Sequence, residues 1–119
     1  MKKSAIEPPA IDLAKLSEIL GTQDGSIVDA ILATFWRTAN EDIICIRRAI
    51  KQRNAAELRD LVHSAKGAAK SVAAELLADS LYSLQKASEN GDWSEIPELY
   101  SVIDREMGQV GKFLDQMKV

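Results

Sequence analysis

One histidine, three basic residues and one glycine stand at spacings that place them along a single face of a helix. They are Arg59, His63, Lys66, Gly67 and Lys70, and His63 is the only histidine in the chain. Residues three, four and seven positions apart share one helical face. The spacing therefore predicts an imidazole flanked by cations and by one position that has no side chain.

The same segment carries a regular apolar stripe on its other side. The stripe consists of Leu58, Val62, Ala65, Ala69 and Val72, which follow one another at steps of three and four residues. At about 100° per residue, the histidine lies about 140° from the centre of this stripe. We therefore expect its ring to face solvent while the stripe faces the core.

Arg59, His63, Lys66, Gly67 and Lys70 form a column along the helix, and its central members have a chemical use. A neutral imidazole nitrogen is a competent nucleophile near neutral pH, and a phosphoryl group carried on it would bring about two negative charges. Lys66 could donate to that group, and Lys70 could add to the positive field. A glycine inside a helix costs about 0.8–1.0 kcal/mol relative to alanine. Gly67 is explained if a side chain there would block access to the ring.

Simpler explanations exist for each residue taken alone. A single exposed histidine and a row of cations are commonly just a solvated face. A glycine inside a helix can serve close packing, but Gly67 lies away from the apolar stripe. The alternative function is a helical interaction module that docks an acidic partner through Arg59, Lys66 and Lys70 without being phosphorylated. A zinc site is disfavoured by the lack of a second histidine, and a nucleophilic pair would require Cys45 to reach His63.

The segment from His63 to Ala73, HSAKGAAKSVA, resembles the signature of histidine-containing phosphotransfer (HPt) domains. In that family the histidine is followed by lysine at +3, glycine at +4, small residues, and usually a second glycine at +10. The helical pattern of the family matches residues 12–117, while the specific motif spans about a dozen residues. This chain departs from the motif at Ala73, where we expect a changed bend after the helix, and at Lys70, which replaces a small or polar residue.

The resemblance implies a role for each residue of the motif. His63 would be phosphorylated on the ring nitrogen far from the backbone, Lys66 would steady the phosphoryl oxygens, and Gly67 would leave room for the partner. The chain would be a phosphoryl carrier and not an enzyme, since no nucleotide-binding signature is present. It would bind no cofactor itself, and Mg²⁺ would lie on the partner. The implied partners are receiver domains of response regulators and a sensor kinase of the hybrid type.

A partner must also dock near the histidine. Trp36, Ile44 and Ala68 are the apolar candidates, because they flank the core stripes and do not belong to them. Aromatic residues dominate interface cores, so Trp36 is the preferred choice, although packing at the edge of the core would explain it equally well. Arg59 and Lys70 complete the predicted docking surface.

The rest of the chain predicts helices almost throughout. A short first helix is expected over 12–20, with Asp12 as N-cap and Gly21 as its end. A long second helix should begin at Asp24 or Ser26 and fade near residues 53–54. Its apolar stripe is Val28, Leu32, Phe35, Ala39, Ile43, Ile46 and Ile50.

Three further helices follow. Asn54 should cap the third in a capping box with Glu57, and a tight turn is expected around residues 71–74. The fourth should end at residues 90–91. The last should begin at Asp92 or Ser94, with Pro97 in its first turn. The stripes of these last two helices are Leu77, Leu81 and Leu84, then Ile96, Leu99, Ile103, Met107, Val110, Leu114 and Met117.

These elements predict an all-α fold, an antiparallel four-helix bundle with a short additional N-terminal helix. Residues 1–10 form a polar, flexible lead-in, and residues 11–119 form one domain. The starting methionine favours a free-standing protein, and the core is complete enough for a monomer. A net charge of −3 argues against nucleic acid, and no apolar run is long enough for a membrane span. The single cysteine indicates a cytoplasmic location.

Overall fold

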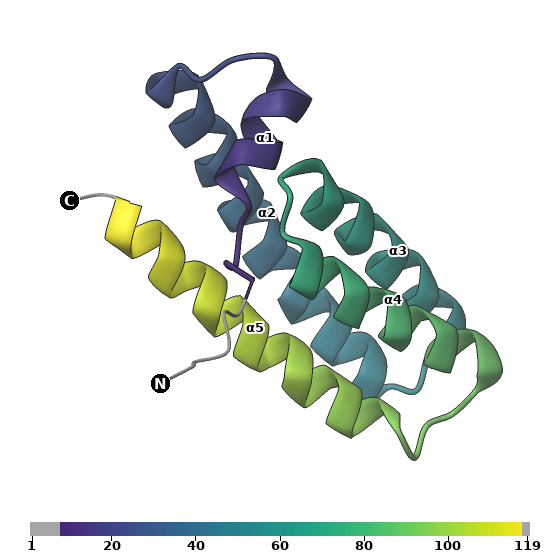
Figure 1. Cartoon of the computed structure of the whole chain (residues 1–119). Coiled ribbons are helices and arrows are strands. Elements are labelled where there is room, and N and C mark those ends of the chain that lie inside the picture. The colour runs from purple at the N-terminus through teal and green to yellow at the C-terminus, as the bar shows by residue number, and fades with distance from the viewer. Residues whose placement is uncertain (1–7, 118–119) are drawn as a thin grey trace, which may run out of the picture.

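The computed structural model describes residues 8–117 and contains, within that range, five α-helices and no strand (Figure 1). The helices are α1 (Leu13–Leu20), α2 (Gly25–Lys51), α3 (Ala55–Ser71), α4 (Glu75–Asn90) and α5 (Ile96–Met117). The all-α prediction is confirmed. Over the described residues, no helix combines the length and the apolar character that crossing a membrane requires.

The four longer helices pack as a bundle. α3 lies between α2 and α4, α4 also packs on α5, and α5 contacts α2. Loops of three to five residues join consecutive helices, so each helix runs antiparallel to the one before it (Figure 1). α3 and α4 form the most extensive pair, and their shared outer face is the one that carries the histidine.

The short helix α1 is attached to the turn between α3 and α4. Asp12 caps α1 by accepting a hydrogen bond from the backbone N–H of Lys15, and its own N–H donates to the carbonyl of Ala73 at 3.0 Å. The ammonium of Lys15 lies 3.1 Å from the carboxylate of Glu75. Of the predicted lead-in, residues 1–7 lie outside the described residues, whereas Ala10 is half-buried against the core.

The helix ends follow the predicted caps closely. Asp24 accepts from the N–H of Ser26 at 2.9 Å, and Asn54 accepts from the N–H of Glu57 at 3.1 Å. The Glu57 carboxylate completes this box by accepting from the side-chain amide of Asn54 and not from its backbone. α5 begins later than expected, at Ile96, because residues 92–95 form a turn first.

The turn after α3 shows how alanine replaces the glycine that the family motif favours. Ala73 has a φ of +60°, in the left-handed region that glycine adopts most easily. Its N–H donates to the carbonyl of Lys70, and the next N–H, that of Ala74, donates to the carbonyl of Ala69. This pair of bonds is a Schellman motif. The turn is thus formed with alanine in the glycine position, at a cost of about 1 kcal/mol.

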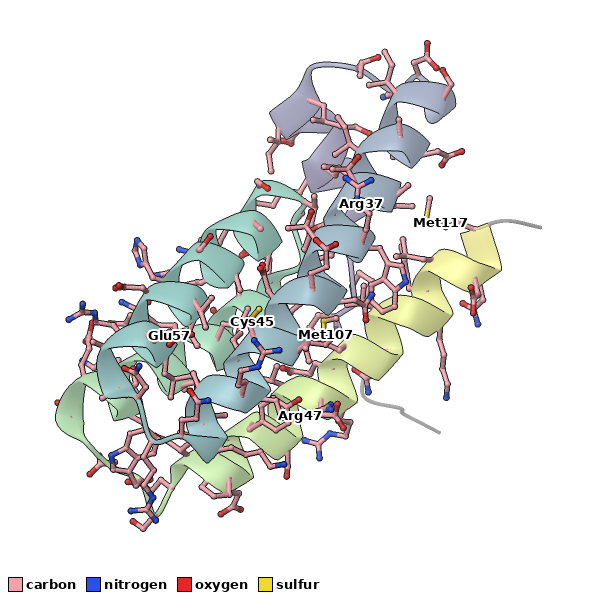
Figure 2. All side chains as sticks on the ribbon, turned by 180° about the vertical axis from the view of Figure 1, so that it is seen from behind. Arg37, Cys45, Arg47, Glu57, Met107 and Met117 are labelled. Atoms are coloured by element: carbon pink, nitrogen blue, oxygen red, sulfur yellow. The ribbon has the colours of Figure 1, made fainter. Side chains whose placement is uncertain are left out.

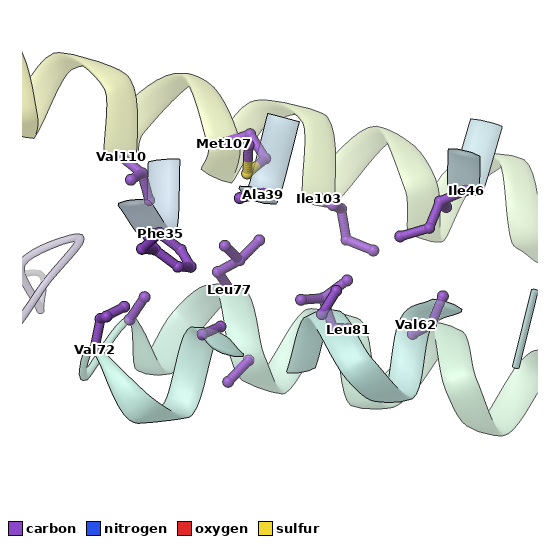
Figure 3. Packing of buried hydrophobic residues seen from close by; sticks show 14 of the residues in the cluster. Phe35, Ala39, Ile46, Val62, Val72, Leu77, Leu81, Ile103, Met107 and Val110 are labelled. Atoms are coloured by element: carbon purple, nitrogen blue, oxygen red, sulfur yellow. The ribbon is translucent and has the colours of Figure 1, made fainter. Parts of the chain in front are cut away.

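The core runs the length of the bundle between α2 and α5 on one side and α3 and α4 on the other. Figure 3 shows Phe35, Leu77 and Val110 meeting at one end and Ile46 and Val62 at the other. Every member of the predicted α3 and α4 stripes is buried. Five members of the α2 and α5 stripes are only half-buried: Ile43, Ile50, Leu99, Leu114 and Met117.

One carboxylate lies partly inside this packing. Asp42 of α2 lines a small, partly open pocket together with Ala65 and Ala68 of α3. Partial burial, with a smaller contribution from the charge of Glu41, raises the pKa of Asp42. A raised pKa means that the folded state binds the proton more tightly than the unfolded state does. The stabilisation from this group is therefore present at low pH and is lost as pH rises through the folded-state pKa.

Asp42→Asn is expected to raise the free energy of unfolding at pH 7, because it removes a partly buried charge. The advantage over the wild type should shrink as pH falls through the pKa of the carboxyl group. Denaturant titrations of both proteins at several pH values measure this. A variant that is less stable at pH 7 would contradict the expectation.

Candidate functional site

His63 lies on the outer face of α3 and is exposed, as its position opposite the apolar stripe predicts. Its ring leans toward α4, where Nδ1 is 3.4 Å from Oε1 of Gln85. Among residues 8–117, no hydrogen bond joins Nε2 to another group. The ring is therefore contacted at the nitrogen nearer the backbone, and the farther nitrogen faces solvent.

Gln85 has a second partner on its own helix. Its Nε2 donates to Oε2 of Glu89 at 3.2 Å, one turn further along α4. His63, Gln85 and Glu89 thus form a continuous row of hydrogen-bonded groups on the α3–α4 face. The half-buried Gln85 is the middle member of this row.

Lys66 lies one turn after His63 and is half-buried by α4. Its ammonium sits 5.1 Å from the centre of the Tyr82 ring, within the range of a cation–π contact. Lys86 approaches the same ring, at 5.8 Å. Tyr82 is otherwise 49% exposed, so two lysines cover part of an aromatic side chain close to the histidine.

The position of Gly67 is open. A Cβ built on this residue would meet no atom within 4 Å outside its own helix segment. No packing constraint within the described chain thus requires glycine here. Lys70 follows in the last turn of α3 and is exposed on the same face.

Arg59 belongs to the column but is engaged locally. Its guanidinium donates to a carboxylate oxygen of the adjacent Asp60 at 3.1 and 3.2 Å. The two side chains are 47% and 73% exposed. An exposed pair of this kind contributes about 0–1 kcal/mol, so the guanidinium can exchange this partner for another anion at little cost.

Ala68 lies on the other flank of Gly67, toward α2. It lines an open groove of about 420 Å³ between α2 and α3, whose walls are mainly apolar. The groove residues are Ala30, Ile31, Thr34, Phe35, Thr38, Ala68, Ser71 and Val72. Since Ala68 directly follows Gly67, the groove opens beside the uncovered part of α3.

Trp36, the preferred docking residue, is not brought together with His63. Its ring packs on α5, where a Cβ added to Gly111 would lie 3.1 Å from the indole. It lines a second groove, between α2 and the end of α5, near Arg37 and Met117 (Figure 2). Its half-buried position corresponds to packing at the core edge. Ile44 is 56% exposed and is also separate from the column, since its position on α2 points away from the core and not toward α3.

Cys45 and His63 do not form a pair. Cys45 is half-buried on the side of α2 next to α3 (Figure 2), whereas the histidine leans toward α4. Within the described residues, no three histidine, cysteine, aspartate or glutamate side chains are grouped as metal ligands would be.

Sequence reasoning missed the α4 half of the site, namely Tyr82, Gln85 and Glu89. Tyr82 carried a signal, because an aromatic residue stands off the Leu77–Leu81–Leu84 stripe. Gln85 and Glu89 carried none, since two polar residues on an amphipathic helix look like any solvated face. Only the placement of α4 against α3 shows that they meet the histidine.

Comparisons with known proteins bear on the family and the fold of this chain. The family model described as "Hpt domain" matches residues 30–116. The solved structure of histidine-containing phosphotransfer protein B from Pseudomonas aeruginosa PAO1 superposes with a TM-score of 0.81. The two sequences are 26% identical over 93% of this chain and 96% of that one. No curated protein sequence matches.

Proposed function

From the premise that this chain belongs to the Hpt domain family, whose members carry phosphoryl groups in phosphorelays, we propose that His63 is its phosphoryl carrier. The histidine would accept the group from a receiver-domain aspartate or a kinase and pass it to another receiver. The observation that supports this most is the placement of an exposed ring whose Nδ1 is held by Gln85 and whose Nε2 faces solvent.

The proposed reaction is an in-line displacement at phosphorus. The lone pair of Nε2 forms the N–P bond while the bond from phosphorus to the aspartyl oxygen breaks, and the aspartate leaves as a carboxylate. Nδ1 keeps its proton and its contact with Gln85 throughout, so no proton has to leave before the attack. Transfer to the next receiver reverses these steps. The partner would supply the aspartate together with Mg²⁺, which stabilises the charge on the phosphoryl oxygens.

Lys66 would stabilise the phosphoryl group once it is on the ring. In the unphosphorylated protein its ammonium lies over Tyr82. An exposed cation–π contact contributes about 0.5–1 kcal/mol, whereas a hydrogen bond to a charged group contributes about 1.5–3 kcal/mol. The phosphoryl oxygens therefore outcompete the tyrosine ring, and the lysine would turn toward them after transfer.

Lys66→Met is expected to slow phosphoryl transfer to this chain by about 10- to 100-fold, the equivalent of one lost charge-assisted hydrogen bond. Rapid-quench measurement of phosphohistidine formation from a labelled receiver tests this. Lys86→Met is the matched control, because it removes a charge from the same tyrosine ring without removing a neighbour of His63 in α3. Equal slowing in both variants would mean that the lysines act only through their general field.

We further propose that the receiver docks over Gly67 with its apolar contacts in the groove between α2 and α3. Ile31, Thr34 and Ala68 would form this contact in place of Trp36 and Ile44. Arg59 and Lys70 would meet acidic groups at the opposite flank. One receiver would bind one copy of this chain, which we expect to be monomeric in sedimentation experiments.

The direct test of the proposed function is incubation of the purified protein with a phosphorylated receiver domain and Mg²⁺. We expect phosphate to appear on this chain in a form that is stable to alkali and labile to acid, as a phosphorus–nitrogen bond to histidine is. Absence of such labelling from a panel of receivers and hybrid kinases would contradict the proposal.

A further inference from the structure

In the row formed by His63, Gln85 and Glu89, the types of the side chains determine which group donates each hydrogen bond. The two ends of a glutamine amide have the same shape but opposite roles, because the oxygen accepts hydrogen bonds and the NH₂ group donates them. An ionised carboxylate only accepts. Glu89 therefore holds the NH₂ end of Gln85, at 3.2 Å, and the oxygen end is turned toward His63.

This orientation in turn selects one form of the imidazole. The oxygen of Gln85 can only accept, so the Nδ1 that faces it at 3.4 Å must carry the proton. In the neutral ring the lone pair is then on Nε2, the nitrogen that faces solvent. We propose that Glu89 is a positioning residue that fixes the tautomer of His63 through the side chain of Gln85.

The carboxylate of Glu89 determines which way the amide of Gln85 is turned. Without it, the amide can turn over and present its NH₂ group to Nδ1, which moves the proton to Nε2 and removes the exposed lone pair. A hydrogen bond to an ionised group is about twice as strong as a neutral one, so the bond to Glu89 prevails over the weaker contact with the ring. The inference about tautomer concerns the resting protein, and only its consequence for transfer rests on the proposed function.

Glu89→Lys tests the proposal, because lysine can only donate. Its ammonium would take the oxygen end of Gln85 and turn the NH₂ end toward the histidine. His63 is the only histidine in the chain, so ¹⁵N–¹H spectra of the labelled protein contain one imidazole without overlap. In mildly alkaline buffer we expect the Nδ1–H tautomer to predominate in the wild type and the Nε2–H tautomer to predominate in the variant. The same tautomer in both proteins would overturn the proposal.

Two further variants separate this effect from a change of charge. Asp79→Lys makes the same charge change on the exposed face of α4, away from Gln85, and should leave the tautomer unchanged. In a Gln85→Leu background, Glu89→Lys should have no further effect on the ring, because the connecting amide is gone. An equal shift with and without Gln85 would contradict the route through the amide.

These spectra, combined with the receiver phosphorylation assay, distinguish the role of Glu89 from the proposed function. A tautomer that switches as expected in a protein that no receiver phosphorylates would support the role of Glu89 and contradict the phosphorelay role of His63. Efficient phosphorylation of a wild type that holds the Nε2–H tautomer would support the phosphorelay role of His63 and contradict the role of Glu89.

Discussion

Replacing His63 with glutamine is expected to abolish phosphorylation of this protein completely. Glutamine keeps a polar side chain of similar reach at an exposed helical position, so the fold should be unaffected. It has no nitrogen lone pair that can attack phosphorus, because its amide nitrogen is conjugated with the carbonyl. No acid-labile phosphate should form on the variant under conditions in which the wild type is labelled.

The same variant separates a phosphoryl carrier from a simple interaction module. Because docking is expected to depend on the groove between α2 and α3 and on the flanking cations, the affinity of His63→Gln for an unphosphorylated receiver should stay within about threefold of the wild type. Titration calorimetry measures this. Residual acid-labile labelling of the variant would place the phosphoryl group on another residue and contradict the assignment of His63.

Filling the gap at Gly67 is expected to make the protein more stable and less active. Since an added Cβ meets no atom within 4 Å, Gly67→Ala should gain the usual difference in helix propensity, about 0.8–1.0 kcal/mol in the free energy of unfolding. A larger side chain in Gly67→Leu would occupy the space into which we propose that the receiver docks. A misplacement of about 1 Å can cost about 10²-fold in rate, so we expect a loss of transfer of that order.

Gly108 provides a matched control for this prediction. It lies in α5, is exposed, and would also accept a Cβ without contact. Gly108→Leu should gain stability in the same way and leave the rate of transfer unchanged. Chemical denaturation and rapid-quench transfer assays on the variants would compare the two sites. Unimpaired transfer by Gly67→Leu would show that the open position serves no partner.

The opposite effects on stability and transfer would explain why a destabilising glycine stands in the middle of α3. Nothing in the packing of the described chain requires it, and an alanine would strengthen the helix. The loss of helix stability at Gly67 would then be offset by the access that a partner gains to His63. Ala73 differs from Gly67, because the turn itself requires its left-handed backbone.

The sequence by itself determined the elements and the column on α3. Apolar spacing fixed which face of each helix is buried, and short polar residues and glycines marked the helix ends, because both signals are local along the chain. His63, Lys66, Gly67 and Lys70 were predicted to share one exposed face for the same reason, since all four lie on one helix.

Only the tertiary structure decided what stands beside that column. Whether the histidine leans toward α2 or α4 depends on how the helices pack. Helical periodicity shows which face of a helix is buried, but not which neighbouring helix lies against each flank of that face. The structure places Gln85, Glu89 and Tyr82 at the site and assigns Trp36 to the contact with α5. A single helix could thus be predicted to carry the exposed histidine, but the group that contacts its ring comes from a neighbouring helix more than twenty residues away, which local patterns do not reach.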